Sequence, residues 1–195
     1  MLEYLLEFDQ KLFLFLNGLR MEQLDMVMYY ISYKFTWVPL YIILTVLLAK
    51  KYRWKALPLM IFVVILITMS DQGSVFFKNF FERLRPCRDP DLEGLVHLVR
   101  QRCGGVYGFV SSHATNAFAL AIFMGKILND RFRVVYPVMI VYAILNGYSR
   151  IYLGVHYPAD VVFGSLLGIG IGLGVVFMWN KWEQYFYKPE RVLPR

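Results

Sequence analysis

Residues 56–80 read ALPLMIFVVILITMSDQGSVFFKNF, and this stretch decides the fold class. Its centre, from Ile61 to Met69, is almost entirely aliphatic. An α-helix needs about 20 mostly apolar residues to cross the hydrocarbon core of a bilayer. The length and composition of the stretch therefore predict a transmembrane helix.

The composition of the whole chain agrees with a membrane protein. Of its 195 residues, 58% are hydrophobic and only 18% are charged, whereas a soluble domain carries about 45–50% apolar and roughly 25% charged residues. The net charge of +7 fits basic cytoplasmic loops, a site for an anionic substrate, or both. Nucleic-acid binding is not expected, because the basic residues stand between membrane-length apolar runs rather than along one polar face.

Four further apolar runs predict four more transmembrane helices, at residues 24–49, 112–129, 134–149 and 156–179. In the last run, Gly164, Gly168 and Gly172 are spaced by four, a pattern that allows close helix packing. The predicted architecture is all-α. It is a polytopic membrane bundle of five spans in a single domain, residues 1–195.

The N-terminal segment, residues 2–19, has the apolar spacing of a helix but also carries charged residues. We therefore expect an amphipathic helix lying at the membrane surface. A short or tilted sixth span is the alternative. The first residues lack a positively charged leader region, so we expect this helix to be retained rather than cleaved.

Basic residues suggest the orientation of the chain in the membrane. They cluster at residues 50–55, at 126–133 and in the tail, 181–195, so we assign these segments to the cytoplasmic side. Residues 82–108 and 149–156 then face outward. These outward segments also hold many arginines, which breaks the positive-inside rule, and an anion-binding site would explain the exception.

The first of three outward polar patches contains Lys78, Arg85 and Pro86. Seven residues advance a helix by nearly two turns, so Lys78 and Arg85 are expected on one helix face, before Pro86 ends the helix. Two cations on one face can clamp a phosphate, because Arg offers bidentate contacts and Lys a point charge. Snorkelling of both side chains to lipid headgroups is the alternative.

The second patch is Ser111-Ser112-His113, at the start of the span predicted for residues 112–129. Hydroxyl groups and backbone N–H groups at a helix N-terminus form a cradle for anions, and His113 stands in that first turn. The alternative is that one serine caps the helix and that the histidine is incidental.

The third patch joins Ser149 and Arg150 to His156 and Asp160. His156 and Asp160 are four residues apart, on one face of a helix. A carboxylate at that place can accept a hydrogen bond from one imidazole nitrogen and leave the other nitrogen free to attack. A purely structural His–Asp cap is the alternative.

These three patches resemble the signature of the type 2 phosphatidic acid phosphatase superfamily, which also includes the vanadium haloperoxidases. That signature is K-x6-R-P, then P-S-G-H, then S-R-x5-H-x3-D. The chain has Lys78-x6-Arg85-Pro86, Val110-Ser111-Ser112-His113 and Ser149-Arg150-x5-His156-x3-Asp160. The first and third motifs match fully. The second departs where Val110 replaces Pro and Ser112 replaces Gly, which leaves the shape of that loop open.

The resemblance implies a metal-independent phosphatase that needs no cofactor. His156 would attack phosphorus and form a phosphohistidine, Asp160 would orient His156, and His113 would protonate the leaving oxygen and then activate water. The phosphate oxygens would be held by Lys78, Arg85, Ser111, Ser112 and Arg150. The sequence shows no acidic cluster suited to Mg²⁺ or Zn²⁺, which agrees with this expectation.

An outward site in a membrane bundle predicts a phosphorylated lipid as substrate, in the inner membrane of a bacterium by family analogy. The candidates are undecaprenyl pyrophosphate, lipid A, phosphatidylglycerol phosphate and phosphatidic acid. Four more arginines favour the first two, which carry several anionic groups: Arg83, Arg88, Arg100 and Arg102. A non-enzymatic lipid-binding or transport protein on the same fold would be expected to lack one of the catalytic residues. The haloperoxidases of the family are soluble, so the five predicted spans argue against that activity. The sequence leaves the oligomeric state open.

Two cysteines, Cys87 and Cys103, both lie in the outward segment 82–108. On an oxidising side of the membrane they can form a disulfide, which would hold the nearby arginines over the site as a lid. Two unpaired thiols in a mobile loop are the alternative, because sequence does not show whether the two Cβ atoms approach each other.

Overall fold

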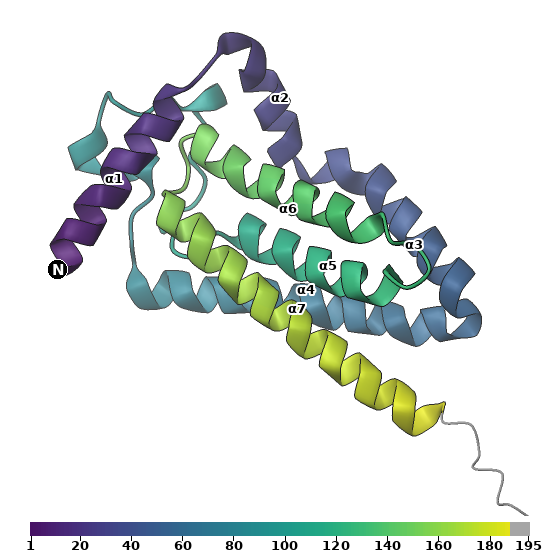
Figure 1. The fold of residues 1–195 in the computed structure, drawn as a ribbon. Helices are drawn as coiled ribbons and strands as arrows, with labels where there is room; N and C mark the ends of the chain where they lie inside the picture. Colours follow the sequence, from purple (N-terminus) through teal and green to yellow (C-terminus); the bar gives the residue numbers. More distant parts are fainter. Residues whose placement is uncertain (188–195) are drawn as a thin grey trace, which may run out of the picture.

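The computed structural model describes residues 1–187, which form an all-helical bundle (Figure 1). Its helices are α1 (Leu2–Gly18), α2 (Glu22–Ser32), α3 (Val38–Tyr52), α4 (Ala56–Phe81), α5 (Ser112–Leu128), α6 (Val135–Tyr152) and α7 (Pro158–Phe186). The prediction of an all-α fold is confirmed. The end of the basic tail, with Lys188, Arg191 and Arg195, lies outside the described residues.

Four of the five predicted spans correspond to single helices, α4 to α7. The prediction of one helix over residues 24–49 is wrong. The chain leaves helical geometry at Tyr33, where φ is −82° and ψ is 119°, and passes through the 3₁₀ turn Lys34–Trp37 before α3 begins. Pro39 stands in the first turn of α3. Proline there has no N–H to donate and clashes with the carbonyl four residues back, so a helix arriving from α2 cannot continue through it.

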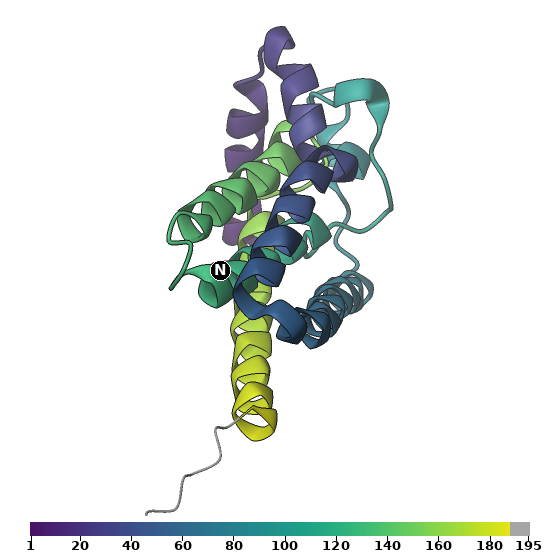
Figure 2. The ribbon, with the colours of Figure 1, turned by 90° about the vertical axis from the view of Figure 1, so that its right-hand side faces the viewer.

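Helix α5 is the centre of the bundle and is enclosed by α4, α6 and α7 (Figure 1, Figure 2). The predicted close packing of α7 is confirmed at its glycines. A methyl group on Gly168 would lie 2.3 Å from the carbonyl oxygen of Thr115, and one on Gly164 would lie 2.8 Å from that of Ser111. The two backbones can approach this closely only because α7 has no side chain at these positions.

Helix α1 lies across one end of the bundle, beside the long connection between α4 and α5, residues 82–111 (Figure 1). Phe13 is fully buried against Tyr157, with ring centroids 5.4 Å apart. The side-chain amide of Asn17 donates to the carbonyl oxygens of Ile151 and Tyr152. The opposite face of α1 exposes apolar side chains such as Phe8 and Phe15. Its inner face ties it to the bundle.

Candidate active site

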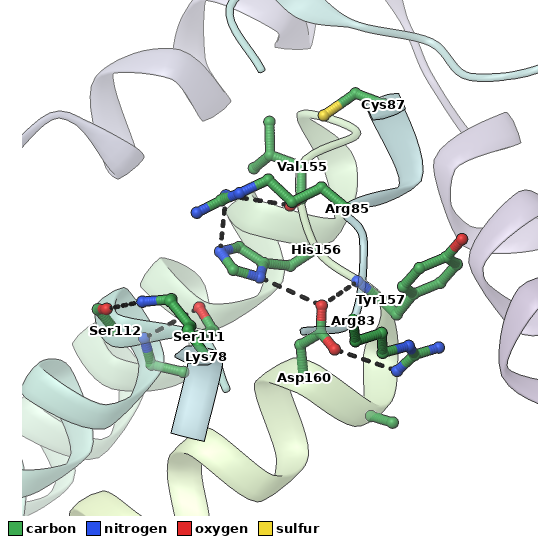
Figure 3. Close-up of polar contacts among 12 residues, drawn as sticks. Lys78, Arg83, Arg85, Cys87, Ser111, Ser112, Val155, His156, Tyr157 and Asp160 are labelled. Atoms are coloured by element: carbon green, nitrogen blue, oxygen red, sulfur yellow. Dashed lines mark hydrogen bonds and ion pairs between the residues drawn. The ribbon is translucent and has the colours of Figure 1, made fainter. Parts of the chain in front are cut away.

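The three polar patches meet at the end of the bundle where α4 and α6 end and α5 and α7 begin (Figure 3). Lys78 stands in the last turn of α4, His113 in the first turn of α5 and Arg150 in the last turn of α6. His156 lies in the turn before α7, and Asp160 lies in the first turn of that helix. Segments far apart in the sequence therefore supply one polar cluster.

Arg85 reaches this cluster from the 82–111 connection and not from a helix, so the predicted helix face shared with Lys78 is wrong. Helix α4 ends at Phe81, and Glu82 adopts left-handed backbone with φ 48°. The backbone N–H of Arg85 instead donates to the carbonyl of Val106, at 3.2 Å. The residue before a proline disfavours helical geometry, and Pro86 imposes this on Arg85. The helix must therefore stop earlier than the spacing alone suggested.

His156 is held between Asp160 and Arg85. Its Nδ1 lies 3.2 Å from Oδ2 of Asp160, and its Nε2 lies 3.1 Å from a terminal nitrogen of Arg85. Arg85 can only donate, so Nε2 accepts and Nδ1 carries the proton given to Asp160. The predicted His156–Asp160 hydrogen bond is confirmed, although α7 begins only at Pro158 and His156 precedes it. This tautomer leaves a lone pair on Nε2.

The surroundings of His156 keep its imidazole neutral. The side chain is 1% exposed. Burial first, and then the positive charges of Arg85, Arg150 and Lys78, lower the pKa of His156 well below 6.5. A neutral imidazole with a lone pair on Nε2, surrounded by cations, can act as a nucleophile toward an anionic phosphorus centre once Arg85 releases that nitrogen.

Two of the three cations have N–H groups that protein atoms do not satisfy. Among residues 1–187, the buried Nε atoms of Arg85 and Arg150 have no hydrogen-bond partner. Lys78 donates to the hydroxyl of Ser112, which also shares a hydrogen bond with Ser74, with 2.6 Å between the oxygens. Buried unpaired guanidinium donors are costly, and the oxygens of a phosphate are suitable acceptors for them.

The two serines of the second patch differ in their surroundings. Ser112 faces Lys78, as a phosphate-binding residue would. Ser111 is fully buried at the N-cap of α5, where its hydroxyl accepts from the N–H of Ala114 at 3.5 Å. Its own backbone N–H donates to the carbonyl of Asp160, at 3.0 Å. These contacts attach α5 to α7 and leave the predicted phosphate contact of Ser111 without support.

Asp160 forms an ion pair with Arg83, which in turn pairs with Asp9. Neither contact was predicted from the sequence. One terminal nitrogen of Arg83 lies 3.1 Å from Oδ1 of Asp160, and the other lies 2.7 Å from Oδ2 of Asp9. Asp9 is 6% exposed and also accepts from the backbone N–H of Ala159, at 2.9 Å. The guanidinium of Arg83 lies over the ring of Tyr157, 4.0 Å from its centroid. Asp9, Arg83 and Asp160 thus form a continuous chain of charges behind His156. Figure 3 shows the Arg83–Asp160 part of this chain.

The other three arginines that were predicted to contact a headgroup each have different surroundings. Arg88 donates to the carbonyl of Gly104, at 3.0 Å, and Arg100 stacks on the ring of Tyr29. Arg102 lines a cavity together with His113. Of the four additional arginines, Arg102 is therefore the one that shares this cavity with His113.

The position of Gly108 against the His156–Asp160 pair was also not predicted from the sequence. A methyl group on this residue would lie 2.9 Å from Oδ2 of Asp160 and 3.6 Å from Nδ1 of His156. Only glycine allows the 82–111 connection to close over the His156–Asp160 pair. A lone glycine in a polar segment gives no sequence signal for such a role.

Three cavities adjoin one another near the site, and His113 lies in the wall of two of them. The outer one, of about 320 Å³, contains Lys34, Arg102 and Arg150 in its wall. A second, of about 240 Å³, shares His113 and Lys34 with the first. A third, of about 420 Å³, is walled by mostly apolar residues of α3, α4, α5 and α6 and shares Asn116 and Tyr142 with the second. The polar cavities beside His113 thus adjoin a mostly apolar cavity between the helices.

Cys87 and Cys103 form a disulfide, with their Cα atoms 5.8 Å apart, so the predicted bridge is confirmed. It joins two parts of the 82–111 connection directly after Arg85-Pro86 and directly after Arg102. The bridge restricts the loop that carries Arg85 into the site. Within residues 1–187, no group of three His, Cys, Asp or Glu side chains is placed to hold a metal ion.

Comparison with known proteins gives consistent results. Residues 54–184 match the model of the PAP2 superfamily. The lipid A 4'-phosphatase of Bacteroides thetaiotaomicron is 37% identical over 171 residues, 86% of this chain and 75% of that protein. The lipid A 4'-phosphatase of Porphyromonas gingivalis is 40% identical over 173 residues, 88% of this chain and 72% of that protein. The crystal structure of a PAP2-type phosphatidylglycerolphosphate phosphatase from Bacillus subtilis has a TM-score of 0.67 at 24% identity, over 95% of this chain and 89% of that one, a likeness that shows the fold.

Proposed function

Because this chain belongs to the PAP2 superfamily and is a membrane lipid phosphatase, we propose that it removes a phosphate from lipid A or a closely related glycolipid. The family resemblance drawn from the three motifs is confirmed. The observation that carries the proposal is the convergence of Lys78, Arg85 and Arg150 on a neutral, oriented His156. Two lipid A 4'-phosphatases among the relatives support the choice of lipid.

The mechanism proceeds in two displacements. Nε2 of His156 attacks phosphorus, so that a nitrogen–phosphorus bond forms while the bond between phosphorus and the lipid oxygen breaks. His113 gives its proton to the departing oxygen. The same histidine then takes a proton from water, which attacks the phosphohistidine and releases inorganic phosphate. Asp160 stabilises His156 while the imidazole carries positive charge.

The cations stabilise the charge that develops on the transferring phosphoryl group. Within the described part of the chain, the Nε atoms of Arg85 and Arg150 are unpaired, and they would donate to oxygens of the phosphoryl group. Lys78 and Ser112 would bind another of these oxygens. Arg85 now bonds to Nε2 of His156, at 3.1 Å. A phosphate arriving there replaces that hydrogen bond and frees the lone pair. We propose that this chemistry needs no metal ion.

The finer architecture belongs to the same proposal. We place α3 to α7 across the membrane as five spans and α1 at the outer surface, within one domain of residues 1–195. Among residues 1–187, two helical stretches, Lys34–Phe81 and Pro158–Phe186, are long and apolar enough to cross a bilayer. With the basic segments 50–55 and 126–133 on the cytoplasmic side, the site faces the periplasm of the inner membrane. The third cavity can then receive hydrocarbon chains from the outer leaflet.

Phosphate release in detergent micelles tests the function. Purified protein is given lipid A, undecaprenyl pyrophosphate, phosphatidylglycerol phosphate or phosphatidic acid, with and without excess EDTA, and His156→Ala serves as the inactive control. We expect release from lipid A, unchanged by EDTA. Release that is highest from another lipid would replace the proposed substrate. No release from any of the four would favour a binding or transport protein, and loss in EDTA restored by Mg²⁺ would refute metal-free catalysis.

A further inference from the structure

The second cavity is a polar chamber, and the proposed mechanism uses only two residues of its wall, His113 and Ser112. Besides His113 and Ser112, its wall includes the polar residues Ser32, Lys34, Asp71, Asn116, Tyr142 and Asn146. It shares Lys34 and His113 with the outer cavity, and it shares Asn116 and Tyr142 with the apolar third cavity. The chamber therefore lies between the place of the phosphate and the place of the hydrocarbon chains.

Asp71 is the most unusual residue in this chamber. It stands on α4 seven residues before Lys78, so the same face of the helix carries both side chains. Its backbone carbonyl accepts a hydrogen bond from the hydroxyl of Ser74, at 2.8 Å, and within the described residues its carboxylate has no hydrogen-bond or ion-pair partner. A carboxylate at membrane depth is expensive, and such groups generally face a cavity in which they have a use.

Asn116 provides a second acceptor in the same chamber. It lies three residues after His113 on α5, so both face the same side of that helix. Its Oδ1 is buried, and no donor among residues 1–187 reaches it. Buried amide oxygens are almost always hydrogen-bonded. Two unsatisfied acceptors on facing helices thus point to a ligand that brings hydrogen-bond donors into the chamber.

We propose that this chamber is a subsite for the polar unit that joins the phosphate to the hydrocarbon chains of the substrate. Asp71 and Asn116 accept hydrogen bonds there from hydroxyl or amide N–H groups, such as those of an acylated amino sugar. In a polyprenyl phosphate the hydrocarbon begins at the phosphate oxygen itself, so it would leave both acceptors unpaired. A site built to bond such donors discriminates strongly against ligands that lack them.

The inference rests on the proposed function, and substrate ratios separate the two. We compare Asp71→Leu and Asp71→Asn on lipid A and on p-nitrophenyl phosphate, which reaches the phosphate site but has no polar linker and no chain. Loss of a hydrogen bond to a charged acceptor lowers kcat/KM by about 10- to 100-fold. We expect Asp71→Leu to lose this much on lipid A and severalfold at most on p-nitrophenyl phosphate. Asp71→Asn, which can still accept, should restore part of the loss.

Two further variants distinguish loss of the subsite from a general folding defect. Asn116→Leu should reproduce the selective loss on lipid A. Gln72→Leu is the matched control, because it makes the same kind of change on the exposed face of α4 and should leave both rates intact. Equal losses on both substrates, or full activity of Asp71→Leu on lipid A, would refute the subsite. A wild-type protein that hydrolyses p-nitrophenyl phosphate but not lipid A would refute the proposed substrate instead.

Discussion

Replacing Arg83 by glutamine is the most informative perturbation of the charge chain behind His156. Glutamine keeps a polar side chain of moderate length but removes the cation between Asp9 and Asp160. Asp160 would then keep its hydrogen bonds from His156 and from the backbone N–H of Tyr157, at 3.2 and 3.0 Å, without a fixed counter-charge. We expect the carboxylate to lose its fixed orientation, and His156 to lose its own orientation with it.

The size of the effect follows from these contacts. The substitution removes two charge-assisted hydrogen bonds, of 3.1 and 2.7 Å, and hydrogen bonds to charged groups contribute about 1.5–3 kcal/mol each. The side chain of Arg83 is 18% exposed, so we take the lower end and expect a total stability loss of about 3 kcal/mol. Misplacing a reacting group by about 1 Å can lower a rate by on the order of 100-fold. We therefore expect kcat to fall by about 10- to 100-fold, with KM little changed.

The assay measures kcat and KM for phosphate release, together with the thermal unfolding midpoint in detergent. Arg88→Gln is the matched control, because Arg88 lies in the same connection and, within residues 1–187, its guanidinium bonds only to the carbonyl of Gly104. Arg83→Lys should recover part of kcat, since it restores the charge. If Arg83→Gln changed KM alone, as loss of a headgroup contact would, Arg83 would not be a positioning residue.

Three further predictions test other parts of the site and bundle. The kcat/KM should fall at acid pH only below pH 6.5, because His156 must be neutral to attack and its pKa is lowered from that value; an acid limb centred above 6.5 in the pH–rate profile would contradict this. Gly108→Ala should lower kcat about tenfold or more by displacing the Asp160 carboxylate, whereas Gly105→Ala, whose added methyl meets no atom within 4 Å, should retain activity. Gly168→Ala should lower the unfolding midpoint, at a cost of about 1–3 kcal/mol from overpacking against Thr115, and equal stability with Gly170→Ala, which has open space, would show that α7 does not pack as described.

The sequence predicted those parts of the fold that depend on local patterns. The aliphatic run at 61–69 was sufficient for α4, because length and apolar content alone decide whether a helix suits a bilayer. The hydrogen bond between His156 and Asp160 was predicted from their spacing. In contrast, the break at Tyr33 depends on Pro39, whose effect reaches back along a stretch that is otherwise apolar.

The remaining features depend on contacts between distant segments, which one sequence does not contain. Arg83 was interpreted as a headgroup cation because nothing in the sequence relates it to Asp9, 74 residues away. Asp9 resembled any other charge on an amphipathic helix. The prediction that Arg85 shares a helix face with Lys78 was wrong because α4 ends at Phe81. The chain then turns back, and Leu84 pairs with Tyr107.

The docking of α1 has a consequence for the biogenesis of the enzyme. Asp9 accepts from the backbone N–H of Ala159, which is synthesised 150 positions later. The charge chain behind His156 cannot close until α7 has been made and α1 has docked against it. If the site works as proposed, we therefore expect a partly assembled chain to release no phosphate from lipids. Activity in a translocation experiment would report completed assembly of the whole bundle, and a bulky fusion that keeps α1 from docking should act like an active-site mutation.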